Sequence, residues 1–453
     1  MNSPHPRRRA HTWAAAAAAC GLHATALAPA AAYAQSVQHP DVQVLADVAL
    51  AKERAVLAIA APGGGLFAVR LSDGYVPQYL KVSADARLEW QTSQPAPAPH
   101  ENPLIAMNAR DGGYWVVGTA QSQELDARAR TGPGWVDRLA AVQYDYLRHI
   151  DANGQPGPAQ TLARTPHMHF VYCGIEVADG YVLAGANGGG PALSPQVPWI
   201  EKLDRAGRRI WEKQFASDNG QEMWGQDVLA GCSGLLPGTD GRITWATPLK
   251  TVEASPDSPD WAQVLNDRQR NHGATFVVQL AADGTELGRT RHYEVGNALL
   301  VPLGNRIMLI ERIVPMLHQA PRGATPQQIT QTLRELRRVQ LEDLGVRLTT
   351  YEGSLQEIDS RSVRMPDFYQ DLNAAYRTPE GGLLLSGCEQ GFYNYLTFID
   401  SSGQVSPRRT WSSSGPQTCA RVAFAPGTSR DQVAMLSSSV PAGLHILTLR
   451  YTR

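Results

Sequence analysis

The sequence predicts an all-β fold built from seven repeats of four antiparallel strands. Three observations predict it. A glycine-containing turn recurs after a short apolar strand, a second tight turn recurs in phase with the first, and a tryptophan recurs a few residues after the second turn. A sequence motif that recurs at a regular spacing along a chain indicates a repeat architecture.

The first turn joins the first and second strands of each repeat. It is made of glycine, asparagine and aspartate, which adopt positive φ at little cost and are typical of tight hairpin turns. Its copies lie at 62–65, 111–113, 179–180, 240–241, 304–305, 380–382 and, in degenerate form, 427–431. The strands that follow are rich in valine, isoleucine, leucine, tyrosine and tryptophan, as buried strands are.

The second turn joins the third and fourth strands. Its clearest copy lies within 198–211, where Asp204 and Gly207 are followed by Trp211. Further copies lie at 83–86, 151–154, 282–284 and 400–403, and the equivalent fourth-strand tryptophans are Trp90, Trp211 and Trp411. We expect these tryptophans to pack between neighbouring repeats.

Seven in-phase units of four antiparallel strands predict a seven-bladed β-propeller. The Asp-x-x-Gly-x-x-x-Trp phrase resembles the quinoprotein-like and WD-like propeller repeats, and the resemblance covers nearly all of residues 35–453. It implies the architecture as a single domain and implies no activity. The resemblance does not imply a bound quinone, since the chain has no adjacent pair of cysteines. We expect no cofactor.

The two ends of the repeat region are complementary. The last repeat stops after its third strand, and an extra strand is predicted at 42–49, before the first repeat. The N-terminal strand is therefore expected to complete the last blade and close the ring, which would remove an exposed sheet edge.

Residues 1–34 have the features of a secretory signal peptide. Arg7 to Arg9 precede an apolar run over 13–32, and Ala32-Tyr33-Ala34 forms a small-x-small cleavage site before Gln35. Lipidation at Cys20 is the alternative that the sequence leaves open. The mature protein is expected in the periplasm or outside the cell.

Charge and hydropathy narrow the class of partner. Removal of three arginines with residues 1–34 takes the formal net charge from −1 to −4. A mildly acidic chain argues against nucleic acid as a partner. No later stretch has eighteen uninterrupted apolar residues, so no transmembrane segment is predicted, and we expect a monomer.

Four cysteines follow the cleavage site, and an even number in an exported chain predicts two disulfides. The blade map places Cys173 and Cys232 in the innermost strands of adjacent third and fourth repeats. It places Cys388 and Cys419 on the same face of the sixth and seventh repeats. We therefore predict the pairs Cys173–Cys232 and Cys388–Cys419.

The longest insertions in the chain lie between the second and third strands of four consecutive repeats. These insertions span about 121–139, 186–198, 248–273 and 313–346, and all are expected on one face of the propeller. Long loops on a rigid scaffold commonly carry function. Capping signals at Ser258 and Thr325 predict helices in the last two insertions. Trp and Arg are frequent interface hot spots, which indicates Trp261, Arg334, Arg337 and Arg338.

Polar residues that open the innermost strands are expected around the channel mouth on this same face, the usual form of a propeller ligand site. They are His100, Glu101, His167, His169, Glu222, Trp224, Asp227, His292, Glu294, Asp367, Tyr369, Asp371 and Arg421. Among them, His100, Trp224 and Tyr369 are the binding candidates. The His167-x-His169 pair is compatible with acid–base work, a metal or plain hydrogen bonding; no metal site is predicted.

The sequence favours a non-enzymatic exported binding protein that presents its long-loop face to a protein or a cell-envelope ligand. An inhibitor or immunity role is one version of this hypothesis. No nucleophile elbow, phosphate loop or zinc-protease motif is present. The alternative is a propeller lyase or glycan-active hydrolase, with catalytic groups drawn from His167, His169, Asp227 and Glu222.

Overall fold

The computed structural model divides the chain into two units, 1–38 and 39–453, and all of the described residues belong to the second. These residues are 41–51, 55–72, 76–93, 101–122, 142–162, 168–188, 196–215, 222–223, 232–238, 240–252, 271–293, 295–313, 345–365, 371–389, 393–407, 409–410, 421–439 and 443–452. Every secondary-structure element defined for them is a β-strand.

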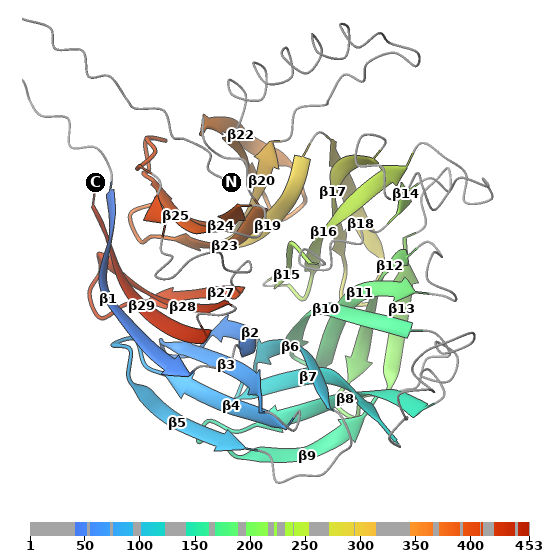
Figure 1. The fold of residues 1–453 in the computed structure, drawn as a ribbon. Coiled ribbons are helices and arrows are strands. Elements are labelled where there is room, and N and C mark those ends of the chain that lie inside the picture. The colour runs from blue at the N-terminus through green and yellow to red at the C-terminus, as the bar shows by residue number, and fades with distance from the viewer. Residues whose placement is uncertain are drawn as a thin grey trace, which may run out of the picture. The chain divides into compact units, whose positions relative to one another are not determined.

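Seven antiparallel sheets are arranged around an axis, so the second unit is a seven-bladed β-propeller, as the sequence predicts (Figure 1). Five sheets have four strands in chain order from the axis outward, and the seventh sheet has three such strands with β1 added outside β29. The fourth sheet has its innermost strand in two pieces. The meander of short, regular strands follows from the two tight turns in each repeat.

The blades have the following strands. Blade 1 contains β2 (Ala55–Ala60), β3 (Leu66–Leu71), β4 (Pro77–Val82) and β5 (Leu88–Ser93). Blade 2 contains β6 (Asn102–Asn108), β7 (Tyr114–Gln121), β8 (Gln143–Ile150) and β9 (Pro156–Thr161). Blade 3 contains β10 (Met168–Val177), β11 (Gly180–Gly188), β12 (Gln196–Asp204) and β13 (Arg209–Gln214). Blade 4 contains β14 (Glu222–Met223), β15 (Gly234–Pro237), β16 (Ile243–Val252), β17 (Asn271–Leu280) and β18 (Glu286–Tyr293).

Blade 5 contains β19 (Val295–Leu303), β20 (Arg306–Ile313), β21 (Gly345–Tyr351) and β22 (Glu357–Arg364). Blade 6 contains β23 (Asp371–Arg377), β24 (Leu383–Glu389), β25 (Tyr393–Ile399) and β26 (Arg409–Thr410). Blade 7 contains β27 (Arg421–Pro426), β28 (Gln432–Ser439), β29 (Gly443–Thr452) and β1 (Asp41–Ala51). The strand β1 pairs antiparallel with β29, from Asp41 opposite Thr452 to Ala51 opposite Leu444 (Figure 1).

The core lies between the blades. Each of the seven neighbouring pairs, blade 7 with blade 1 included, shares one cluster of buried apolar side chains. In β28, Val433 and Met435 pack toward blade 6, and Ala434 and Leu436 pack toward blade 1. A central strand is thus buried on both faces, and because of this its sequence is a continuous apolar run rather than an alternating one.

An aspartate organises the second turn of the clearest repeats. Asp204 Oδ1 accepts hydrogen bonds from the backbone N–H groups of Ala206 and Arg208, at 2.9 Å each. Asp151 and Asp400 make the same pair of bonds in blades 2 and 6. The glycine of this turn has positive φ, 71° at Gly207, which a residue with a side chain rarely adopts. The Asp-x-x-Gly motif therefore specifies the tight turn between the third and fourth strands.

The fourth-strand tryptophans pack on the second turn of the next blade. Trp90 of blade 1 faces Gly154 of blade 2, and Trp211 of blade 3 faces Gly284 of blade 4. The Trp211 Nε1–H also donates to the carbonyl of Ala282 in the same turn, at 3.1 Å. The expectation that these tryptophans pack between blades is confirmed for both; Trp411 lies outside the described residues.

The insertions of blades 2 and 5 begin and end close to where the sequence places them, and those of blades 3 and 4 are shorter than expected. In blade 3, β11 continues to Gly188 and β12 begins at Gln196, inside the insertion expected at 186–198. In blade 4, β16 continues to Val252 and β17 begins at Asn271, so the strands take up the ends of the insertion expected at 248–273. The helices expected after Ser258 and Thr325 lie outside the described residues.

We predict that Gly284→Ala lowers the free energy of unfolding by about 2 kcal/mol. The backbone there has φ +84°, and an added Cβ would lie 2.8 Å from Trp211 Cδ2. Urea unfolding followed by fluorescence measures the loss. The control is Gly288→Ala in the adjoining strand, where no atom lies within 4 Å of the added Cβ. An equal effect of both substitutions would contradict the packing argument.

Candidate functional site

Blades 2 to 5 have the long connections between their second and third strands. The chain runs from Gln121 to Gln143 in blade 2 and from Gly188 to Gln196 in blade 3. It runs from Val252 to Asn271 in blade 4 and from Ile313 to Gly345 in blade 5. In a meander these connections all leave from the same edge of the blades. We call this edge the long-connection face.

The other three blades make this same connection in a few residues. It occupies 72–76 in blade 1, 390–392 in blade 6 and 440–442 in blade 7. The lengthening is therefore confined to four consecutive blades, on one side of the long-connection face. It is large in blades 2, 4 and 5 and small in blade 3, where the connection occupies 189–195.

The innermost strand of blade 4 is interrupted. Met223 of β14 pairs with Lys250 of β16, and Gly234 of β15 pairs with Ala246. The inner strand advances eleven residues from Met223 to Gly234 while its partner advances four, so the register of the ladder is broken between β14 and β15. Irregularities of this kind in a sheet are frequent next to functional sites.

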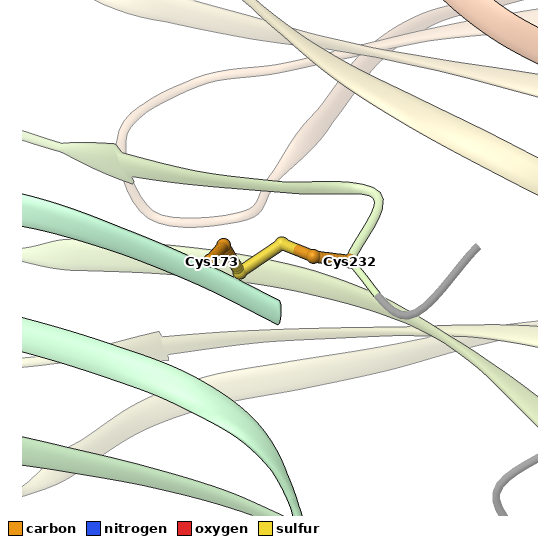
Figure 2. The surroundings of a disulfide bond; sticks show 2 residues. All are labelled: Cys173 and Cys232. Carbon is orange, nitrogen blue, oxygen red and sulfur yellow. A yellow bond between two sulfur atoms is a disulfide. The ribbon is translucent and has the colours of Figure 1, made fainter. Parts of the chain in front are cut away.

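A disulfide joins the chain just before β15 to the neighbouring blade. Cys173 of β10 is bonded to Cys232, two residues before β15, with a Cα–Cα distance of 5.9 Å (Figure 2). The first predicted pair is thus present in the structure. Cys388 lies in β24 and Cys419 lies outside the described residues, so the second pair stays a prediction.

Only the backbone positions of some candidate residues are described. His169 lies in β10, Glu222 forms the start of β14, and Asp371 and Arg421 open β23 and β27. The remaining site candidates lie outside the described residues and stay predictions: His100, His167, Trp224, Asp227, Trp261, Glu294, Arg334, Arg337, Arg338, Asp367 and Tyr369.

Glu101 does not point to the channel mouth. Its carboxylate lies 2.5 Å from Arg148 Nη2 in an ion pair whose side chains are 2% and 6% exposed. Burial raises the pKa of the Tyr146 phenol beside this pair, and the Glu101 charge raises it further. The sequence expectation was wrong because Glu101 precedes β6 and turns into blade 2, where it neutralises a buried guanidinium.

His292 is the second correction. It belongs to β18, the outermost strand of blade 4, because the innermost strand of blade 5 begins only at Val295. Its Nδ1 lies 2.6 Å from Glu311 Oε2 and its Nε2 lies 2.5 Å from the Tyr351 hydroxyl. The imidazole therefore joins blades 4 and 5 rather than facing the channel.

Asp145 is a residue that the sequence analysis missed. It lies two residues from Leu147, a member of the cluster between blades 2 and 3, close to the start of β8 and the end of the blade 2 connection. Burial raises the pKa of its carboxyl to about 7, and the charge of Glu201 in blade 3 adds to this. A carboxyl that titrates near neutrality suits proton transfer. Nothing in the local sequence around it signals this.

Among the described residues, no group of three or more His, Cys, Asp or Glu side chains is arranged to hold a metal ion. No protein-family model matches this chain, and no curated protein matches it. The fold and the geometry of the residues above therefore carry the functional inference.

We predict that Asp145→Asn stabilises the protein at high pH. The folded-state pKa of about 7 lies above the ordinary value of 3.8. The native fold therefore favours the protonated carboxyl, and wild-type stability is full below about pH 4 and falls as pH rises through 7. The amide avoids this loss, so the variant should gain about 1–2 kcal/mol at pH 8.5, with the gap closing toward pH 4.

Urea unfolding across this pH range measures the gap. The control is Asp204→Asn, since the Arg208 backbone N–H lowers the pKa of Asp204. That carboxylate contributes stability above its ordinary pKa and loses it on acidification, so its variant should be the less stable one at high pH. A pH-independent gap for Asp145→Asn would contradict the argument.

Proposed function

We propose that this protein is an exported binding propeller that presents its long-connection face to a protein or a cell-envelope ligand. The observation that carries the proposal is the confinement of the long second-to-third connections to blades 2 to 5, between strands of a closely packed scaffold. Rigid scaffolds commonly place their recognition residues on such connections.

The opposite face supports the proposal by contrast. Its turns are short, and their aspartates are used to hold the turns themselves. The pKa of Asp204 is lowered because the Arg208 backbone N–H donates to it, and the pKa of Asp283 is lowered by the Thr285 N–H. Carboxylates whose oxygens already accept hydrogen bonds within a turn have few remaining sites for a ligand. This favours the long-connection face as the binding face.

The residues proposed to bind come from the sequence of the connections and the channel mouth. Trp261, Arg334, Arg337 and Arg338 have the side chains that most often dominate interface energies. His100, Trp224 and Tyr369 would face a ligand at the channel mouth. An inhibitor or immunity function would use the same face against a partner protein.

Export is part of the proposal and rests on residues 1–34 and their cleavage site after Ala34. The Cys173–Cys232 disulfide fits an extracellular or periplasmic protein, since such bonds persist in oxidising compartments. The described residues contain no helix long and apolar enough to cross a membrane.

A second candidate function is a lyase or a glycan-active hydrolase. The observation that favours it is the Asp145 carboxyl, whose pKa is raised to about 7 by burial and further by the charge of Glu201 in blade 3. His167, His169, Asp227 and Glu222 would supply the other acid and base groups. Release of unsaturated or reducing ends from a polysaccharide, lost in the Asp145→Asn protein, would favour this class.

We also propose that β1 closes the ring. It is an outermost strand contributed by the other end of the chain, and Val42 is buried in the cluster between blades 6 and 7. Both Arg409 Nη2 and Nε donate to Asp41, with Nη2 3.0 and 3.1 Å from the two carboxylate oxygens. These contacts tie the first strand to the sixth and seventh blades.

We predict that Trp261→Ala combined with Arg334→Ala and Arg338→Ala weakens partner binding at least about ten-fold, because hot-spot side chains carry most of an interface's energy. Capture from a periplasmic extract, followed by titration with the identified partner, measures the loss. The control combines Arg87→Ala and Arg208→Ala on the opposite face, where these side chains are 84% and 81% exposed. Equal binding by all three proteins would refute the proposed face.

We predict that a mature chain beginning at residue 52 has an apparent Tm lower by about 10 °C, since it loses a whole strand of blade 7. It should also self-associate through the uncovered edge of β29. Thermal unfolding and light scattering after gel filtration measure both effects. A synthetic peptide of residues 41–51 should restore the monomer and the Tm. A truncated chain as stable as the full mature chain would show that β1 does not close the ring.

A further inference from the structure

The innermost strand of blade 4 has the least ladder support in the ring. In each of the other six blades this strand is a single element of six to ten residues. In blade 4 it is divided into β14, with two residues, and β15, with four. Few ladder hydrogen bonds therefore hold β15 to its own sheet, and its contacts with other blades matter more.

Three ties described for the start of β15 reach into three different blades. Cys232 is bonded to Cys173 of β10 in blade 3 (Figure 2). The Leu300 N–H of β19 in blade 5 donates to the Ser233 carbonyl at 2.6 Å. The Ser233 N–H donates to the Ala246 carbonyl of β16, in its own blade, at 3.0 Å. The disulfide is the covalent tie, and it is the one that joins this segment to blade 3.

The other end of β15 is held by a local turn. The Gly238 N–H donates to the Arg242 carbonyl at 2.7 Å, which closes the hairpin between β15 and β16. This bond does not involve the cysteines, so it persists whatever happens at Cys232. The segment can therefore part from the ring only at its N-terminal end, where the disulfide lies.

The disulfide lies at the edge of the apolar cluster between blades 3 and 4. Cys173 and Cys232 are partly buried there, whereas Ile200 of β12, Trp245 of β16 and Val278 of β17 are almost fully buried inside the cluster. Thiol–disulfide exchange requires an attacking thiolate to reach one of the two sulfurs. Partial exposure favours this attack in the folded protein, and the packing of the inner cluster members does not need the bond.

We propose that the Cys173–Cys232 disulfide is a redox-sensitive latch, which holds the innermost strand of blade 4 to blade 3 and which a dithiol opens without unfolding the ring. An expected consequence, weaker partner binding after reduction, rests on the proposed function, because blade 4 carries one of the longest connections of the long-connection face. The opening of the latch does not depend on that function.

The chemistry of opening is thiol–disulfide exchange with a dithiol as the reductant. A thiolate of the dithiol attacks one of the two sulfurs, and the other sulfur leaves as a thiolate and takes up a proton. The second thiol of the reductant then attacks the mixed disulfide. Both cysteines become thiols, and the dithiol gives up two electrons and becomes a disulfide.

The first test is differential alkylation of the full mature chain, treated with dithiothreitol at about pH 8, where thiolates are available to attack. Mass mapping follows each cysteine separately, and near-UV circular dichroism follows the fold. Cys173 and Cys232 should become alkylated while the folded signal is retained. Urea below the unfolding transition should leave the rate of reduction nearly unchanged, since the reaction does not pass through the unfolded chain.

Hydrogen–deuterium exchange locates the opening. On reduction, peptides from β15 and β10 should exchange about ten-fold faster, as expected for a local opening that leaves the rest of the structure closed. Peptides from β2 and β3 of blade 1 should not change, because that blade contains no cysteine.

Two double variants separate the latch from other effects of the reductant. Cys173→Ser with Cys232→Ser is permanently open, so its exchange should match that of the reduced wild type and dithiothreitol should add nothing. Cys388→Ser with Cys419→Ser keeps the latch, so dithiothreitol should act on β15 as it does in the wild type. If the first variant fails to fold, reduction of the folded wild type decides alone.

Reduction that proceeds only as fast as the whole chain unfolds in urea would overturn the proposal and make the bond a structural staple. Unchanged exchange in β15 after reduction, or equal loosening of blade 1, would also overturn it. A latch that opens in a protein that captures no partner would sustain the latch while the binding function fails. Partner capture by a protein whose bond resists dithiothreitol in the folded state would do the reverse.

Discussion

The packing of one blade's outer strand on the second turn of the next blade is the contact on which the ring depends. Trp90 lies against Gly154, Leu162 against Gly207, and Trp211 against Gly284. Each of these glycines has positive φ and no side chain, so a large group from the neighbouring blade can approach the turn backbone. The aspartate that caps a turn such as that at Asp204 keeps this surface in shape. The repeated sequence motif thus encodes the contact that each blade makes with its neighbour.

The seams between blades combine apolar packing with a few buried charges. Every neighbouring pair of blades shares an apolar cluster, and blades 3 and 4 are also joined by the Cys173–Cys232 bond. A buried ion pair lies within blade 2, at Glu101 and Arg148, and in blade 5 the fully buried Glu311 pairs with the partly exposed Arg347. Such pairs gain little net stability over apolar groups of the same size. Their value lies in fixing which side chains face each other.

The functional inference follows from where the chain departs from its repeat. The short-turn face repeats the same hydrogen bonds from blade to blade, whereas the long-connection face differs in blades 2 to 5. The interrupted inner strand of blade 4 lies in the same group of blades and ends at the disulfide. A regular scaffold that is modified on one side only is what a binding protein requires, because the ring keeps its stability while the connections change.

The sequence by itself determined the number of blades, the positions of their turns, which blades have the longer connections, and the Cys173–Cys232 pair. The turns and strands are local features that depend on glycine at positive φ, on aspartate that caps a turn and on apolar strands of regular length. The disulfide follows from the order of the blades that these features define. Only the tertiary structure decided what Glu101, Asp145 and His292 meet. Strand periodicity tells which side of a strand a residue lies on. The twist of the blade and the side chains of its neighbour decide whether a residue on that side faces the channel, packs between two blades or meets a counter-ion.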